Sequence, residues 1–142
     1  VYARKINKKM AKKALWTTLS AKVRDRELIV VEDVSLSDAK TKQAAIFFKP
    51  FFAESKFPRM QKGNGVLVVI PGKNDTIRRA MRNLPYAGVG EARNLNAYEV
   101  LRHKYILFSK NTLSAFDGRS GQKERSLRSE GVIKKRASKR VI

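Results

Sequence analysis

The pattern of hydrophobic and polar residues along this chain predicts helices in some segments and strands in others. Between residues 8 and 25, small and apolar side chains recur at every fourth position, which predicts a helix with one buried stripe. The members of this stripe are Ala11, Leu15, Leu19 and Val23. Residues 28–31 then form a short continuous apolar run, which is typical of a strand covered on both faces.

The alternation continues through the middle of the chain. Residues 40–53 have helical spacing, although Pro50 should end or kink the helix early because proline lacks an amide hydrogen. Residues 66–70 are the clearest strand, and Asn74 or Asp75 can cap the helix that follows. The pattern further predicts that this helix runs to about residue 84 and that strands lie near 88–90 and 105–108. It also predicts a short helix over 97–102 and a last turn at 112–116.

Strands that alternate with helices of ten to eighteen residues are the signature of βαβ units, whose strands lie parallel. We therefore expect an α/β fold, a three-layer Rossmann-like domain with a mainly parallel sheet of about four strands. This body would occupy residues 1–116. From residue 117 the periodicity stops and serine, glycine, arginine and lysine dominate, so residues 117–142 should be a basic tail that is disordered when unbound.

The chain carries 32 lysine and arginine residues against 12 aspartate and glutamate residues, a net charge of +20 over 142 residues. Such an excess indicates a polyanionic partner, which could be nucleic acid, an acidic membrane surface or an acidic protein. The charge is uneven: residues 1–26 hold nine basic residues and one acidic, and residues 117–142 hold nine and three. The expected body between them is nearly neutral apart from a third basic patch at residues 73–83.

Five lysines lie on the first predicted helix with hardly an acidic neighbour. They are Lys8, Lys9, Lys12, Lys13 and Lys22. A solvated helix face is the ordinary explanation for a run of charge, but such faces usually mix both signs. We therefore favour contact between these lysines and phosphate groups.

Composition excludes several kinds of chemistry. The chain has no cysteine, and one histidine cannot supply a two-histidine metal site. No apolar run approaches the roughly 20 residues of a membrane-spanning helix. We expect a soluble protein without metal, cofactor, membrane partner or small-molecule substrate.

His103 follows a predicted helix and should form a hydrogen bond with the last carbonyl groups of that helix. Trp16 and the phenylalanines should pack in the core rather than stack on bases.

A parallel sheet raises the question of a nucleotide site, because ligands of such folds bind beyond the carboxyl ends of the strands. The glycines of residues 63–65 precede a strand, and residues 88–93 lack the third glycine of a dinucleotide fingerprint. The turn at 71–75 could hold an anion at a helix start, but Asp75 would repel it. We therefore do not expect an enzyme.

Five stretches of the sequence are distinctive in their order. They are residues 7–10 with 14–15 and 19–22, residues 28–32, 40–42, 82–85 and 95–103. In this order they resemble the universal large ribosomal subunit protein 4 family in its bacterial form. The resemblance implies a structural constituent of the cytoplasmic large ribosomal subunit that binds large-subunit rRNA, supports subunit assembly near the polypeptide exit tunnel and touches neighbouring large-subunit proteins.

In that family a first strand and a long basic loop that lines the tunnel precede this stretch. The chain begins with Val1 rather than methionine, and we expect both features to be missing from it. If this is the whole chain, docking on rRNA carries over from the resemblance, whereas lining of the tunnel does not. A free RNA-binding regulator of translation or transcription stays an alternative, as does a small nucleotide-binding enzyme on a doubly wound sheet.

The residues expected to contact rRNA are cations that neutralise phosphates and polar groups that add hydrogen bonds. The polar candidates are Thr41, Asn83 and Asn96. The cationic candidates of the body are Lys8, Lys9, Lys12, Lys13, Lys40, Lys42, Arg78, Arg79 and Arg82. Those of the tail are Lys134, Lys135, Arg136, Lys139 and Arg140.

Overall fold

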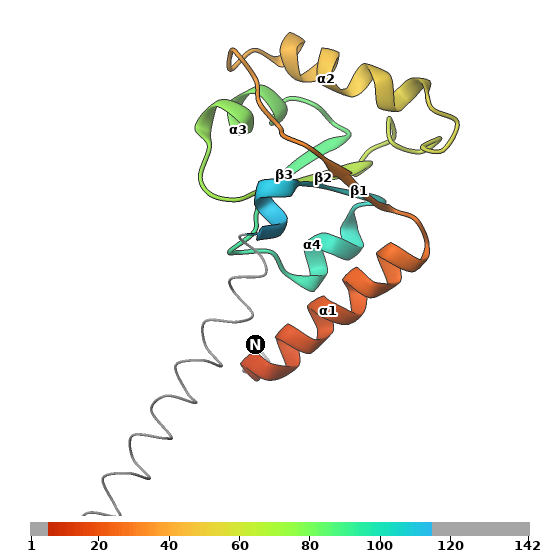
Figure 1. The fold of residues 1–142 in the computed structure, drawn as a ribbon, viewed down its shortest axis with the longest axis vertical. Helices are drawn as coiled ribbons and strands as arrows, with labels where there is room; N and C mark the ends of the chain where they lie inside the picture. Colours follow the sequence, from red (N-terminus) through yellow and green to blue (C-terminus); the bar gives the residue numbers. More distant parts are fainter. Residues whose placement is uncertain (1–5, 115–142) are drawn as a thin grey trace, which may run out of the picture.

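Four parallel strands form the middle layer of the structure, a computed structural model that describes residues 6–114 (Figure 1). The elements in chain order are α1 (Lys8–Arg24), β1 (Leu28–Val31), α2 (Thr41–Ala53), β2 (Val66–Ile70), α3 (Asp75–Met81), β3 (Ala87–Glu91), α4 (Ala97–Arg102) and β4 (Tyr105–Ser109). A further helical turn covers 110–114. The expected three-layer α/β fold is confirmed in this part of the chain, and the tail lies outside it.

The strand order is β1-β4-β2-β3, and every neighbouring pair is parallel. β4 and β2 are therefore central, and all of their residues are buried. In register, Val66 of β2 lies opposite Tyr105 on one side and Ala87 on the other. Because β1 and β3 are the edges, their residues are mostly only half-buried.

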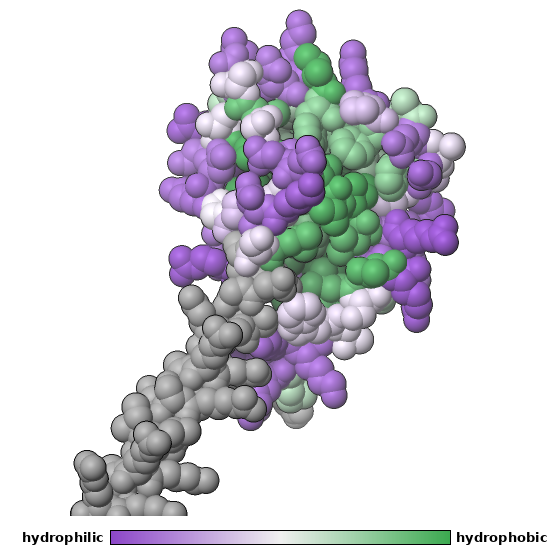
Figure 2. Space-filling view, in the orientation of Figure 1, coloured by the Kyte–Doolittle hydropathy of each residue, from purple (hydrophilic) through white to green (hydrophobic). Residues whose placement is uncertain are grey.

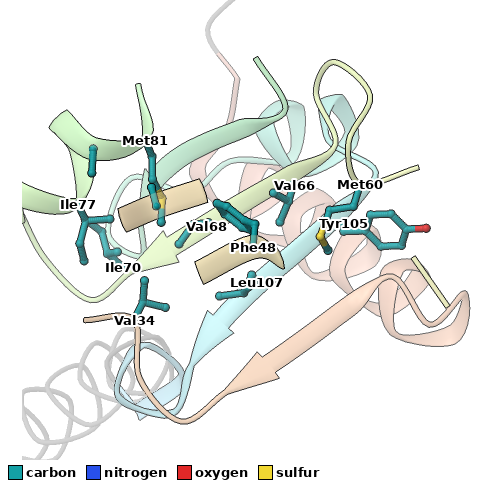
Figure 3. Close-up of a cluster of buried hydrophobic side chains, with 12 residues drawn as sticks. Val34, Phe48, Met60, Val66, Val68, Ile70, Ile77, Met81, Tyr105 and Leu107 are labelled. Atoms are coloured by element: carbon teal, nitrogen blue, oxygen red, sulfur yellow. The ribbon is translucent and has the colours of Figure 1, made fainter. Parts of the chain in front are cut away.

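Helices cover both faces of the sheet. On one face α2 and α3 pack on alternate residues of the central strands, including Val66, Val68 and Leu107. Figure 3 shows Phe48 of α2 among these side chains, with Met81 of α3 above the same surface. On the other face α1 and α4 pack on the intervening residues, among them Leu67, Val69, Ile106 and Phe108. The alternation of side chains along each strand thus divides the core in two.

The structure corrects two expectations about the first elements. Only Leu15 and Leu19 of the predicted stripe on α1 are buried, whereas Val23 is 60% exposed and Ala11 is exposed as well. Ala11 lies in the exposed first turns of α1, whereas Val23 lies off the buried side, which continues from Leu19 to Lys22. β1 is not covered on both faces, because it is an edge strand, and Val30 is 48% exposed. Figure 2 shows hydrophobic side chains gathered over β1 within a hydrophilic surround.

Pro50 does not end α2 early, so this part of the expectation is wrong: the helix continues to Ala53. Proline cannot donate to the carbonyl of Ile46, but Ile46 is half-exposed, so water can reach this part of the helix. Aromatic packing holds the last turn in place. The ring centroids of Phe48 and Phe52 lie 6.1 Å apart, and Phe52 meets Tyr86 at 5.2 Å.

The two short helices begin at asparagine caps. The side chain of Asn74 accepts a hydrogen bond from the amide of Ile77 at 3.2 Å, and that of Asn96 accepts one from Glu99 at 2.9 Å. Both satisfy an amide that would otherwise lack a partner in the first turn. The first cap was expected from the sequence, and the second candidate for it, Asp75, is the first residue of α3.

Candidate nucleic-acid interface

The first two turns of α1 extend past the packed part of the domain. Every residue from 6 to 14 is exposed, and Figure 1 shows this end of α1 reaching beyond α4. The lysines expected to bind phosphate lie here, at Lys8, Lys9, Lys12 and Lys13. The first turn has no acidic residue, and no ion pair joins these lysines to an acid among residues 6–114. The result is a projecting, uncompensated cationic surface.

A second group of candidates lies on the opposite face of the sheet, where α2 and α3 pack together. Lys40 precedes α2 and Lys42 lies in its first turn; both are exposed, and Thr41 between them is half-buried. Arg78, Arg79, Arg82 and Asn83 are all exposed along α3 or just after it. Of this group only Lys40 forms an ion pair with an acid of residues 6–114, since its Nζ lies 3.4 Å from Oδ2 of Asp38. The structure therefore separates the body's candidates into two surfaces.

Asn96 already has a structural role, because its side-chain oxygen caps α4. Its side chain is exposed, so the amide nitrogen can still donate to a ligand. The five candidates of the tail lie outside the described residues. They stay predictions.

Lys22 is not accessible to phosphate, and the expectation for this residue is wrong. It is buried, and its Nζ donates to Oε2 of Glu27 at 2.6 Å and to the carbonyl oxygens of His103 and Lys104 at 3.0 and 2.9 Å. Position 22 follows Leu19 by three residues, so it falls on the buried side of α1. Its carbonyl partners are far away in sequence, which is why the pattern could not reveal them.

Glu27 holds two lysines at once. Besides Lys22 it pairs with Lys104 through its other carboxylate oxygen. Burial alone would raise the pKa of Glu27, but hydrogen bonds from Lys104 and Lys22 outweigh burial and leave that pKa below its ordinary value. This network joins the end of α1 to the residues that precede β4.

His103 has the structural role expected from its position. It is the C-terminal cap of α4, and its Nδ1 lies 3.0 Å from the carbonyl oxygen of Glu99. Since a carbonyl can only accept, Nδ1 is the donor. The ring also lies against β3, because a methyl group built on Gly88 would come within 2.6 Å of Nε2. Neither contact leaves the imidazole facing a ligand.

Most of the aromatic side chains are core residues, as expected. Phe48 and Phe108 are buried, and Phe47, Phe51 and Phe57 are half-buried in edge or tilted ring contacts. Trp16 is 39% exposed, so the expectation of a core position is wrong for that residue.

A hollow of about 190 Å³ lies beyond the carboxyl ends of β2 and β3. β2 leads into α3 on one face and β3 into α4 on the other, so the hollow lies where the connections diverge, the usual ligand position in such sheets. Its charged lining consists of Lys73, Arg78, Glu91 and Glu99. Because the two signs are mixed and no glycine-rich turn contributes amides, the hollow is poorly suited to nucleotide phosphates.

Sequence reasoning missed four exposed cations at the other end of the strands, where the amino ends of the strands lie together. They are Arg26, Arg59, Lys62 and Lys104. No charge run marks them, because they come from three separate loops. The one signal in the sequence was that each stands shortly before a predicted strand, and the amino ends of parallel strands share one edge.

Comparison with known proteins agrees with the resemblance seen in the sequence. The family model for the ribosomal protein L4/L1 family matches residues 1–119. The chain belongs to the ribosomal protein L4/L1 family. Among its L4/L1 relatives, large ribosomal subunit protein uL4 of Solibacter usitatus is 37% identical over 81% of the chain and 51% of its own length. The uL4 protein of Clostridium novyi is 31% identical over 82% of the chain and 52% of its own length.

The chain therefore spans about half the length of the L4/L1 relatives that it matches. The matched region includes both groups of candidates on the body, from α1 to α3. Within residues 6–114, no helix is long and apolar enough to cross a membrane, and no three potential metal ligands cluster.

Proposed function

We propose that this chain is the α/β body of a large-subunit ribosomal protein that binds large-subunit rRNA and supports subunit assembly near the polypeptide exit tunnel. It would act within the cytoplasmic ribosome beside neighbouring large-subunit proteins. Membership of the L4/L1 family and the names of the uL4 relatives support this assignment.

The observation that carries the proposal is the uncompensated lysine surface on the projecting end of α1. Each lysine that neutralises a phosphate releases condensed counterions, which drives binding without reading the sequence. A projecting helix can enter between RNA strands, where a flat protein face cannot. The cations of α2 and α3 would add phosphate contacts from the other face of the sheet, with Thr41 and Asn83 donating hydrogen bonds there. Asn96 would donate from the start of α4. The tail cations would extend the same electrostatic attraction.

A salt titration tests this proposal. The full 142-residue chain is bound to transcribed bacterial large-subunit rRNA over a range of salt concentrations, and Lys8, Lys9, Lys12 and Lys13 are replaced together by glutamine. The slope of log affinity against log salt should fall by about 0.7 to 0.9 for every phosphate that the variant no longer neutralises. Glutamine is a good helix former, so α1 should persist, and circular dichroism checks that it does.

The matched control replaces the same four lysines by arginine, which keeps the charge and should preserve the slope. An unchanged slope in the glutamine variant would contradict the assigned surface. Sedimentation distinguishes the ribosomal role from that of a free regulator. The protein should remain with large subunits through a high-salt wash, and recovery in the soluble fraction alone would overturn the structural role.

A further inference from the structure

The side of the sheet where the strands begin, its amino edge, carries a cationic surface distinct from both groups described above. We name it the basic rim and define it as Arg26, Arg59, Lys62 and Lys104, all exposed. They come from the turn after α1, the segment before β2 and the residue before β4. This edge lies on the right in Figure 1, and Figure 2 shows hydrophilic side chains along the same side.

Backbone hydrogen bonds hold these three loops together. The amide of Lys104 donates to the carbonyl of Asn64 at 3.1 Å, and the amide of Ile106 donates to that of Glu27 at 2.9 Å. The ring of Phe57 meets that of Tyr105 edge-on, with centroids 5.4 Å apart. Since β1, β4 and β2 are neighbours in the sheet, the loops that enter them are neighbours too. The rim is thus one fixed surface rather than a set of unrelated side chains.

The acids near the rim are already used. Glu27 is buried between Lys22 and Lys104, and Asp25 lies 3.2 Å from Arg24. Within residues 6–114, no acid pairs with Arg26, Arg59 or Lys62. A hydrogen bond to Glu27 raises the pKa of Lys104, and the nearby positive charge of Arg59 opposes that rise. Three of the four rim cations are therefore not neutralised by an acid of residues 6–114, an arrangement that favours an anionic partner.

Arg26 adopts a backbone conformation that residues other than glycine rarely adopt. It follows the C-terminal cap of α1 with a φ of 57°, the left-handed region that glycine adopts most easily. Its amide donates to the carbonyl of Val23 at 3.1 Å, and that of Glu27 donates to Lys22 at 2.9 Å, which is the pattern of a Schellman motif. A charged side chain thus occupies a position where glycine would serve the fold better.

We propose that the basic rim is a second RNA-binding surface, which contacts a phosphate backbone separate from that bound by the α1 lysines. This inference rests on the proposed function. Arginine pairs with phosphate through two parallel hydrogen bonds. The exposed amides of Gln61 and Asn64 alternate with the rim cations and suit ribose hydroxyls or further phosphate oxygens. No large apolar side chain is exposed between residues 54 and 65, so this segment of the rim lacks the apolar centre of a typical protein interface.

The length of α1 separates the two surfaces. Its 17 residues span roughly 25 Å, with the lysines at one end and Arg26 just past the other. Binding at both ends would fix the orientation of the domain on the RNA, which one cationic patch alone does not do. The two sites would also reinforce each other, because one contact raises the effective concentration of the second.

The test compares variants of the full chain on transcribed bacterial large-subunit rRNA. Replacing Arg59 and Lys62 together by glutamine should lower affinity several-fold and reduce the salt slope by about 1.4 to 1.8 if each contacts one phosphate. The matched control is the double variant Lys73→Gln and Lys110→Gln. It removes the same charge, but from the carboxyl edge, where each lysine pairs with an exposed acid. This control should retain the slope within about 0.5.

Arg26→Gly separates folding from binding. The variant should unfold at the same temperature or higher, because glycine relieves the left-handed backbone, yet it should bind rRNA more weakly. Arg26→Lys should restore affinity. Chemical footprinting should show that the Arg59 and Lys62 variant exposes nucleotides different from those exposed by the α1 glutamine variant.

The outcomes separate the two proposals. If the rim variants bind like the carboxyl-edge control while the α1 variant binds weakly, the rim inference is wrong and the proposed function stands. If the unaltered chain does not bind the rRNA, the proposed function fails as well. Identical footprints for rim and α1 variants would also overturn the inference of a separate contact.

Discussion

Lys22 and Glu27 form a buried ion pair, with 2.6 Å between Nζ and Oε2, at the turn that joins α1 to β1. The carbonyl oxygens of His103 and Lys104 complete the surroundings of the ammonium group. One side chain thus ties the first helix to the entry of a central strand. No buried side-chain nitrogen or oxygen among the described residues lacks a hydrogen-bond partner, so the pair costs the fold no unsatisfied group.

Glu27→Gln should lower the free energy of unfolding by about 3 kcal/mol, because it leaves Lys22 buried without its carboxylate. The loss should lie at the lower end of the range for buried pairs, since two carbonyl acceptors remain. Urea unfolding at neutral pH measures it. Glu32→Gln is the matched control, because it breaks only the exposed pair with Lys110 and should cost less than about 1 kcal/mol. Equal losses in the two variants would contradict the assigned role.

The stabilising effect of Glu27 should depend on pH. Its pKa in the folded protein lies below the ordinary value of 4.5, so its contribution is complete above that pH and is lost as the pH falls through the folded-state pKa. The difference in unfolding free energy between the unaltered chain and Glu27→Gln should stay constant from pH 8 to about 5.5 and narrow below about 4.5. Urea titrations at each pH test this, and a constant difference down to about pH 3 would refute it.

Gly88→Ala should destabilise the fold by about 1 to 3 kcal/mol, because its methyl group would meet Nε2 of His103 at 2.6 Å. The ring cannot swing away without breaking its bond to Glu99. Gly72→Ala is the control, since nothing lies within 4 Å of its added methyl group. If the imidazole causes the loss, Gly88→Ala should cost much less in a His103→Ala background, and additive effects would rule that cause out.

The sequence predicted the local structure of several helices and strands, but it did not predict where each strand lies in the sheet. Apolar runs predicted the strands at 66–70 and 105–108, and Asn74 predicted a helix start, because these features depend on a few adjacent residues. The exposure of Val30 depends instead on the strand order, in which β4 rather than β1 is central. That order is fixed by contacts between segments nearly 80 residues apart.

The same limit applies to the candidate interface. The lysines at the start of α1 were visible as a run of charge, and they are exposed. Lys22 belongs to the same run, but its carbonyl partners lie more than 80 residues away, so periodicity alone could not separate it from the others. The basic rim was not predicted from the sequence, because its cations are scattered along the chain and only the parallel sheet brings them together.

Pro50→Ala should raise the free energy of unfolding by about 1 to 2 kcal/mol. Alanine restores a donor to the carbonyl of Ile46 and relieves the steric conflict of an interior proline. Together these effects should outweigh the conformational entropy that the unfolded chain gains. Thermal and urea unfolding measure the gain. Pro71→Ala, in the turn after β2, should bring none. A destabilised Pro50→Ala would mean that the proline ring itself packs favourably at this end of α2.

Asn96 allows the structural and RNA-binding roles of one side chain to be separated. Asn96→Ala should cost about 1 kcal/mol, because it removes the cap on the amide of Glu99. Asn96→Asp keeps an acceptor at the helix start and should preserve stability, but it replaces the donor amide with a negative charge. If Asn96 contacts rRNA, the aspartate variant should bind several-fold more weakly while unfolding at the same temperature. Equal rRNA affinity for the aspartate variant and the unaltered chain would remove Asn96 from the interface and leave it as a cap alone.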